Sequence, residues 1–131
     1  SDRMSTSVVS QNSALWSYEA SDAALANSPQ LVVASAKFVY QIEIDNTANT
    51  GAASYVKLYD DNTSSSVTVG TSVPMAIFVA PAATKLSVTF PYGVGTYFAN
   101  GIVWACVTTA GTAGTTSPTS SVICRMQYNA S

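Results

Sequence analysis

Histidine is absent from the 131-residue chain, and charged residues make up only 9% of it. Without histidine there is no His-based catalytic triad, no imidazole metal ligand and no imidazole pH switch. Five Lys and Arg residues stand against seven Asp and Glu residues, for a formal net charge of −2. A nucleic-acid-binding surface needs a basic stripe, so we expect no nucleic-acid partner.

Long apolar runs are missing as well. The hydrophobic residues, 47% of the chain, fall in short runs, far from the roughly 18 consecutive residues that a membrane-spanning helix needs. The first residues, SDRMSTSVVSQNS, lack the apolar run of a secretory signal. We therefore expect no membrane partner, and the length predicts a single domain.

Only two cysteines are present, Cys106 and Cys124, each within an alternating apolar segment. If these segments pair as a hairpin, the two thiols would be cross-strand neighbours within reach of a disulfide. Buried free thiols are the other possibility. Two cysteines without histidine supply too few zinc ligands, so we expect no metal and no cofactor.

Strong helix formers are scarce, and Ser, Thr, Ala, Gly and Asn fill the spaces between short apolar runs. These runs predict strands at 30–34, 37–45, 55–59, 67–69, 75–79, 85–90, 101–108 and 122–128. The pattern predicts an all-β fold, an antiparallel β-sandwich or jelly roll of about seven to nine strands. The continuous run at 75–79 predicts a strand covered on both faces.

The alternation within these runs also predicts the core. Side chains two residues apart point to the same face of a strand, so each apolar series marks an interior face. The residues expected there are Phe38, Tyr40, Ile42, Ile44, Val56, Leu58, Ile77, Leu86, Val88, Phe90, Ile102, Trp104, Cys106 and Cys124.

Residues 1–27 differ from the rest because their apolar residues are scattered. We interpret them as an extended N-terminal arm that precedes a β-sandwich domain at 28–131. The arm could pack along a neighbouring subunit or add an edge strand to its own domain, and 17–26 could form a single helical turn. The residues expected to contact a partner are Val8, Val9, Leu15, Trp16 and Tyr18.

No catalytic motif is visible, and we expect no enzymatic activity. Nucleophilic catalysis needs a base beside the nucleophile, and the candidates are Lys37, Lys57 and Lys85, which we interpret as solvent-facing charges in or beside strands. The Gly-Val-Gly of 93–95 lacks the third glycine and the helix of a dinucleotide site.

Two further patterns could each mark a binding site or be ordinary structure. Asp60, Asp61 and Asn62 could begin a calcium site, although a turn is the plainer hypothesis. Aromatic pairs at Tyr55 with Tyr59 and at Tyr92 with Tyr97 could stack on sugars, or could simply pack in the core or an interface. A carbohydrate-binding β-sandwich module is therefore an alternative function.

The low charge indicates a protein that is packed against others. Soluble monomers usually carry a charged surface, whereas this one must be covered largely by Ser, Thr, Asn and Ala. Burying a hydroxyl against a partner costs far less than burying an unpaired charge. The composition favours an assembly subunit over a free enzyme.

The segment from Tyr55 to Thr108 resembles a recurring type of small structural protein of tailed bacteriophages. The shared elements are an aromatic-Val-Lys-Leu-Tyr strand, a VGT-x-x-P turn, an apolar strand ending in Pro-Ala, a Gly-rich turn and an aromatic-x-x-Gly-Ile strand. Here they stand at 55–59, 69–74, 75–82, 91–95 and 98–102.

This resemblance implies a β-sandwich virion protein without enzymatic activity, assembled in the host cytoplasm. The expected role is a capsid decoration or cement protein that bridges capsid subunits, as a homotrimer. Its partners would be the major capsid protein or another virion protein. A tail, neck or fibre component is the alternative within the same class.

Overall fold

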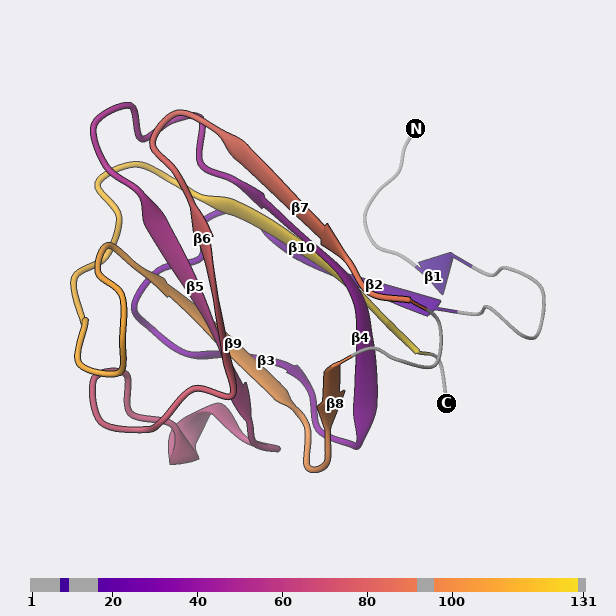
Figure 1. The fold of residues 1–131 in the computed structure, drawn as a ribbon. Helices are drawn as coiled ribbons and strands as arrows, with labels where there is room; N and C mark the ends of the chain where they lie inside the picture. Colours follow the sequence, from indigo (N-terminus) through magenta and orange to yellow (C-terminus); the bar gives the residue numbers. More distant parts are fainter. Residues whose placement is uncertain (1–7, 10–16, 92–95, 130–131) are drawn as a thin grey trace.

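The structure is a computed structural model and describes residues 8–9, 17–91 and 96–129. Within these ranges the regular structure is all β, strands β1 to β10, apart from one 3₁₀ turn at Ser64–Ser66. Figure 1 shows the strands arranged as two facing sheets. Among the residues described, no helix is long and apolar enough to cross a membrane.

Every pairing in the two sheets is antiparallel. Sheet A has six strands: β1 (Val8–Val9), β2 (Ser17–Asp22), β10 (Ile123–Asn129), β4 (Lys37–Asp45), β7 (Lys85–Thr89) and β8 (Thr96–Phe98). Each strand pairs with the next in this order up to β7. β8 pairs with the first residues of β4, at 37–39, whereas β7 pairs with residues 41–45. Sheet B has four strands in the order β3 (Gln30–Val33), β9 (Ile102–Val107), β5 (Ser54–Asp60) and β6 (Ala76–Ala80).

Eight of these strands have the connectivity of a jelly roll. The order β2-β10-β4-β7 in sheet A faces the order β3-β9-β5-β6 in sheet B, so the chain passes back and forth between the sheets. Two interlocked Greek keys of eight strands define this architecture. The expectation of an antiparallel sandwich or jelly roll is confirmed, with β1 and β8 as additional short strands.

The core lies between the two sheets, and most of its expected members are there. Ile42, Ile44, Val56, Leu58, Ile102, Trp104, Cys106 and Cys124 are buried, and Leu86, Val88 and Phe90 are partly buried against them. The last three lie on β7 or directly after it, at the end of the main strand order of sheet A, which explains why they are covered less completely. Leu25, Phe98, Val122 and Met126 are also buried in this core.

A β-bulge overturns the assignment of Phe38 and Tyr40 to this core. Gln127 pairs with Gln41 whereas Tyr128 pairs with Val39, so β4 carries one extra residue, Tyr40. An extra residue shifts the inward-facing series by one position. Val39 is therefore fully buried, while Phe38 and Tyr40 are half-buried and lie outside the core cluster.

The assignment of Ile77 to the core is also wrong, and so is the expectation that the run at 75–79 is covered on both faces. β6 is an edge strand that pairs with β5 alone within the described chain. Its inward residues are Ala76 and Phe78, which pack on the core, while Met75, Ile77 and Val79 are exposed.

Two local expectations differ from the structure for the same reason, a tertiary contact that outweighs local preference. The helical turn considered for 17–26 does not form in Ser17–Asp22, which is strand β2 because it pairs along β10. The strand expected at 67–69 is a loop in which Val67 packs with Tyr59 and Val103 on the outer face of sheet B.

Two strands of the N-terminal segment, β1 and β2, belong to sheet A. β2 lies between β1 and β10 in sheet A, and Leu25 is buried in the core. The described part of residues 1–27 therefore belongs to the sheet of its own domain, with β1 at the edge and β2 as a strand of the jelly roll.

Asn46 and Asn49 form a buried polar network at one end of the sandwich, among connections that cross between the sheets. Asn46 Nδ2 lies 3.1 Å from the carbonyl oxygens of Ala52, Ala80 and Pro81, to which it donates. Its Oδ1 accepts from Ser54 Oγ at 2.7 Å and from Asn49 Nδ2 at 2.9 Å.

Asn49 extends the network to a third connection. Its Nδ2 donates to the Ser120 carbonyl at 3.0 Å, and its Oδ1 accepts from the Ser120 backbone N–H at 2.8 Å. The network therefore joins the β4–β5, β6–β7 and β9–β10 connections, each of which passes from one sheet to the other.

Replacing Asn46 with Ala should lower the free energy of unfolding by about 3 kcal/mol, because several buried groups lose their partner at once. Chemical denaturation followed by tryptophan fluorescence measures the loss. Asn62→Ala, at an exposed loop position, is the control and should stay within about 0.5 kcal/mol of wild type. Equal stabilities for the two variants would contradict the role assigned to Asn46.

Candidate functional site

The lysines considered for catalysis do not form a nucleophilic site. Lys57 is fully buried, and its Nζ donates to the carbonyl oxygens of Thr112 at 3.1 Å and Gly114 at 2.9 Å. Burial lowers the pKa of Lys57 below its usual range. Lys37 is also buried, so the expectation of solvent-facing charges is wrong for both. Lys85 is exposed and lies 3.8 Å from Asp45.

The acidic loop after β5 is organised by backbone hydrogen bonds. The Asp60 carboxylate accepts from the N–H groups of Ala99 at 3.2 Å and Asn100 at 2.8 Å. Asp61 Oδ1 accepts from Thr63 N–H at 3.1 Å, as in an Asx turn. The described residues contain no group of three or more acidic, Cys or His side chains that could hold a metal ion.

The tyrosines expected to offer a stacking surface are dispersed. Tyr59 is buried and packs with Val67 on the outer face of sheet B, and Tyr55 is half-buried. Tyr97 on β8 is 46% exposed, while Tyr92 lies outside the described residues. Of the aromatic pairs, only Tyr97 is seen to present an accessible ring.

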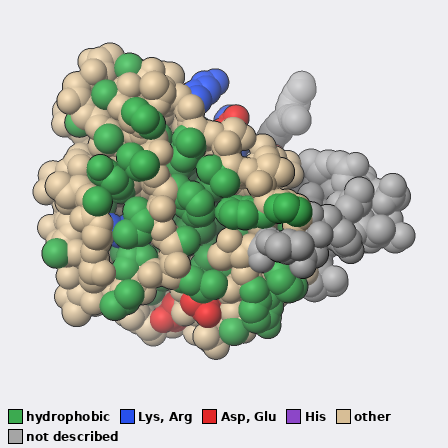
Figure 2. Space-filling model, viewed as in Figure 1, with side chains coloured by type: hydrophobic (Ala, Val, Ile, Leu, Met, Phe, Trp, Pro, Cys, Tyr) green, Lys and Arg blue, Asp and Glu red, His purple; other side chains and the backbone are tan. Residues whose placement is uncertain are grey.

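The outer side of β6, together with the residues just before it, forms the first candidate interaction surface, which we call the apolar edge. It consists of Val73, Met75, Ile77 and Val79, residues that are 79, 45, 37 and 43% exposed. Figure 2 shows hydrophobic side chains gathered across the middle of the face that carries β6. None of the four is charged, so nothing in the series opposes contact with another apolar surface.

The apolar edge adjoins an open side of the sandwich. β6 ends the strand order of sheet B, and β7 ends the main strand order of sheet A. Between them, the Phe78 and Phe90 rings meet at a centroid distance of 6.2 Å. A strand edge without a partner presents unpaired N–H and C=O groups, which can pair with another chain.

The outer face of sheet A forms the second candidate surface, which we call the polar array. Cross-strand pairing places its side chains in two rows. One row contains Glu19, Gln127, Gln41 and Thr89, and the other contains Ser21, Arg125, Glu43 and Ser87. Side chains two residues apart on a strand share a face, so both rows belong to one polar surface.

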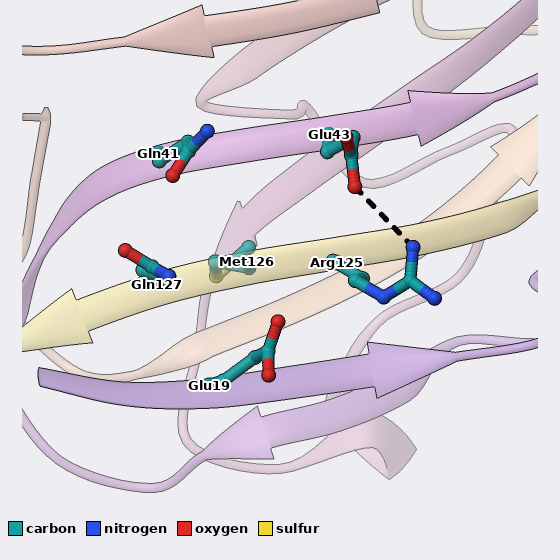
Figure 3. Close-up of a pocket in the computed structure, with 6 residues that line it drawn as sticks. All are labelled: Glu19, Gln41, Glu43, Arg125, Met126 and Gln127. Atoms are coloured by element: carbon teal, nitrogen blue, oxygen red, sulfur yellow. Dashed lines mark hydrogen bonds and ion pairs between the residues drawn. The ribbon is translucent and has the colours of Figure 1, made fainter. Parts of the chain in front are cut away.

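The centre of the polar array is a hollow of about 210 Å³ lined by Glu19, Gln41, Glu43, Arg125, Met126 and Gln127. Figure 3 shows the residues contributed by β2, β10 and β4, with Arg125 reaching Glu43. Their closest atoms, Nη1 and Oε1, are 3.3 Å apart. Gln41 Nε2 also donates to Ser87 Oγ at 3.2 Å.

Asp45 lies at the end of β4 beside this array. Hydrogen bonds from the Thr47 hydroxyl and backbone N–H, at 2.6 and 3.0 Å, lower the pKa of Asp45 below its usual range. Its charge is thus committed to the β4–β5 turn.

The N-terminal residues expected to contact a partner are only partly visible. Val8 pairs with Tyr18, and Val9 with Ser17, through the backbones of β1 and β2. Leu15 and Trp16 lie outside the described residues. Their assignment as contact residues stays a prediction.

Sequence reasoning missed both surfaces as sites. The apolar edge is visible in the sequence as an uncharged run, but a sequence pattern does not tell an edge strand from a central one. The polar array is visible as the outward half of each alternation, at Gln41, Glu43, Arg125 and Gln127, which alone indicates only a solvated face.

The two cysteines are buried free thiols that face the same core from opposite sheets, Cys106 on β9 and Cys124 on β10. Their strands lie in different sheets and do not pair as a hairpin, so the condition for a cross-strand pair is not met. Burial raises the pKa of Cys106 from 9.0 to about 12, and raises that of Cys124 further. Because the thiolate is the reactive form, both are chemically inert in the folded state.

These thiols should make stability fall at alkaline pH. A group whose pKa is raised on folding contributes stability that is complete below its unfolded pKa and is lost as pH rises toward its folded pKa, here from about 9 upward. Urea unfolding should show an extra loss of about 2–3 kcal/mol between pH 8 and 10 for wild type relative to the double variant Cys106→Ala/Cys124→Ala. Parallel pH profiles would contradict this account. The lowered pKa of Lys57 acts in the opposite direction and is common to both proteins.

Comparison of the chain with protein-family models, with curated proteins and with solved structures gives no match. Two surfaces of this jelly roll are candidate interaction sites, the apolar edge on sheet B and the polar array on sheet A. Each is built from strands that the core holds in place.

Proposed function

We propose that the protein is a non-enzymatic structural subunit that works by packing against other protein subunits. The observation that carries this proposal is the apolar edge, Val73, Met75, Ile77 and Val79, on a strand with a free side. Removing apolar surface from water is favourable by about 25 cal/mol per Å², part of which is offset by the entropy lost on association. Free strand edges are usually protected by charge, by proline or by a covering element.

The low charge of the chain supports the same proposal. With charged residues at 9% of the sequence, a neighbouring subunit can cover large parts of the surface without desolvating unpaired ions. The exposed residues of the described loops are mostly Ser, Thr, Asn, Ala and Gly. Small neutral side chains of this kind suit close packing between subunits.

We further propose that the assembly is the virion of a tailed bacteriophage and that the protein decorates or cements its capsid. Support comes from the sequence resemblance of the segment from Tyr55 to Thr108. Jelly rolls are common in viral coat proteins, which agrees with this assignment, but they also occur in lectins, so the fold alone does not choose. A tail, neck or fibre position is the alternative.

The proposed partners are further copies of this chain, in a trimer, and the major capsid protein or another virion protein. A cement protein stabilises a shell by bridging adjacent subunits, which requires an interface of about 1,200 Å² or more. The apolar edge supplies the uncharged centre that such an interface needs, with polar loops around it.

Adding charge to the apolar edge should abolish self-association. Multi-angle light scattering over a hundredfold concentration range should give an oligomer for wild type and a monomer for Ile77→Lys/Val79→Lys. Both positions are exposed, so circular dichroism and thermal unfolding should remain close to wild type. Ser21→Lys/Thr89→Lys adds the same charge to exposed positions of sheet A and should assemble as wild type does.

Two outcomes would contradict the structural role of the apolar edge. One is a wild-type chain that stays monomeric across the whole range, and the other is equal association of the two double variants. The virion assignment is tested separately with antibodies against the chain. Labelling of phage particles at many copies supports capsid cement, few copies support a tail, neck or fibre component, and no labelling contradicts both.

A further inference from the structure

We propose that the polar array on the outer face of sheet A binds a neutral oligosaccharide, which extends along β4 from Arg125 to Tyr97. This site lies on the other sheet from the apolar edge and goes beyond the proposed structural role. Neither inference depends on the other, because they use different faces of the sandwich.

The array has the shape that a flat, extended ligand needs. Its two rows come from four neighbouring strands, β2, β10, β4 and β7, so adjacent side chains within a row are about 5 Å apart and the rows about 7 Å apart. The hollow at its centre opens on the outer side of the sheet, with Gln127 between Glu19 and Gln41, and is backed by Met126. A sugar ring could therefore enter without movement of the backbone.

The chemistry of the side chains matches hydroxyl groups. A sugar hydroxyl both donates and accepts, and the array offers both functions side by side. The amides of Gln41 and Gln127 donate and accept, the carboxylates of Glu19 and Glu43 accept, and Arg125 donates. Gln41 already donates to Ser87 Oγ at 3.2 Å, which fixes its amide while leaving its carbonyl oxygen available.

The charge of the array disfavours an anionic ligand. Glu19, Glu43 and Arg125 are its three charged members, so two carboxylates and one guanidinium leave a net charge of −1. The neighbouring Asp45 and Lys85 carry opposite charges and lie 3.8 Å apart. A phosphate or a carboxylated glycan would meet net repulsion, whereas a neutral sugar would not.

An aromatic ring stands where an extended sugar chain would leave the array. Tyr97 pairs with Phe38 across β8 and β4, and their ring centroids are 4.8 Å apart. Phe98, the next residue on β8, is fully buried, so Tyr97 points to the outer face, where it is 46% exposed. Phe38 and Gln41 are three residues apart on β4, about 10 Å, so the ligand that reaches both has several sugar units.

The ring gives the site its apolar contact. Aromatic faces pack against apolar ligand surfaces while the phenol hydroxyl remains in water, and the C–H faces of pyranose rings are such surfaces. The Phe38 ring beside it limits the freedom of Tyr97 and thereby reduces the entropy lost on binding. The site thus combines a hydrogen-bonding hollow with one stacking surface.

Amide NMR titration of the full chain with neutral hexasaccharides of glucose, mannose and N-acetylglucosamine tests the proposal. At least one of them should shift the amides of β2, β4, β8 and β10 saturably. Tyr97→Ala should weaken that affinity at least tenfold, and Gln127→Ala several-fold, because each removes one kind of contact. Gln30→Ala, an exposed glutamine on sheet B, is the matched control and should bind as wild type does.

Several results would overturn the proposal. They are the absence of saturable shifts with every neutral hexasaccharide, equal affinity of the Tyr97→Ala and Gln30→Ala variants, and tighter binding of a sialylated oligosaccharide than of its neutral counterpart. Shifts of the same amides on raising the protein concentration without sugar would mean that this face binds another copy of the chain. The first three results leave the apolar edge and its charge variants unaffected, whereas self-association through this face would also change the assembly of Ser21→Lys/Thr89→Lys.

Discussion

The arrangement of this jelly roll depends on how the chain passes from one sheet to the other. Hydrophobic contact between the sheets is strong but non-directional, so it does not by itself fix which connection lies beside which. Asn46 and Asn49 supply that direction, because their amides join three crossing connections through hydrogen bonds within a buried site. Leaving a buried polar group without a partner is costly, and the observed arrangement of the three connections provides partners for both amides.

Much of the fold could be predicted from the sequence because strand alternation is a local property. The series Ile42 and Ile44, Val56 and Leu58, and Ile102, Trp104 and Cys106 each identify a buried face correctly. The bulge at Tyr40 could not be predicted, because it is defined by a register shift against β10, more than eighty residues away. The exposure of Ile77 depends in the same way on the place of β6 in the strand order rather than on its own composition.

The candidate surfaces show a similar division between local and long-range information. The low charge of the sequence by itself favours packing against other proteins, and the apolar edge is the surface at which we propose that this packing occurs. The residues of the polar array come from segments at 19–21, 41–43, 87–89 and 125–127. No spacing along the chain reveals that these segments form one surface, and only the topology brings them together. Tyr97, by contrast, can be recognised from the sequence as a candidate stacking aromatic, although its expected neighbour is Tyr92 and its observed neighbour is Phe38.

The asparagine network joins connections at one end of the sandwich, and this has a consequence for the changes that the chain can tolerate. The β4–β5, β6–β7 and β9–β10 connections share one network, so an altered length in any of them disturbs the others. The β5–β6 connection at the opposite end carries the 3₁₀ turn Ser64–Ser66, two of whose three residues are exposed, and has no part in that network. We therefore expect Ser64–Ser66 to tolerate sequence variation and inserted peptides. This turn is then the natural place to display foreign epitopes on the protein.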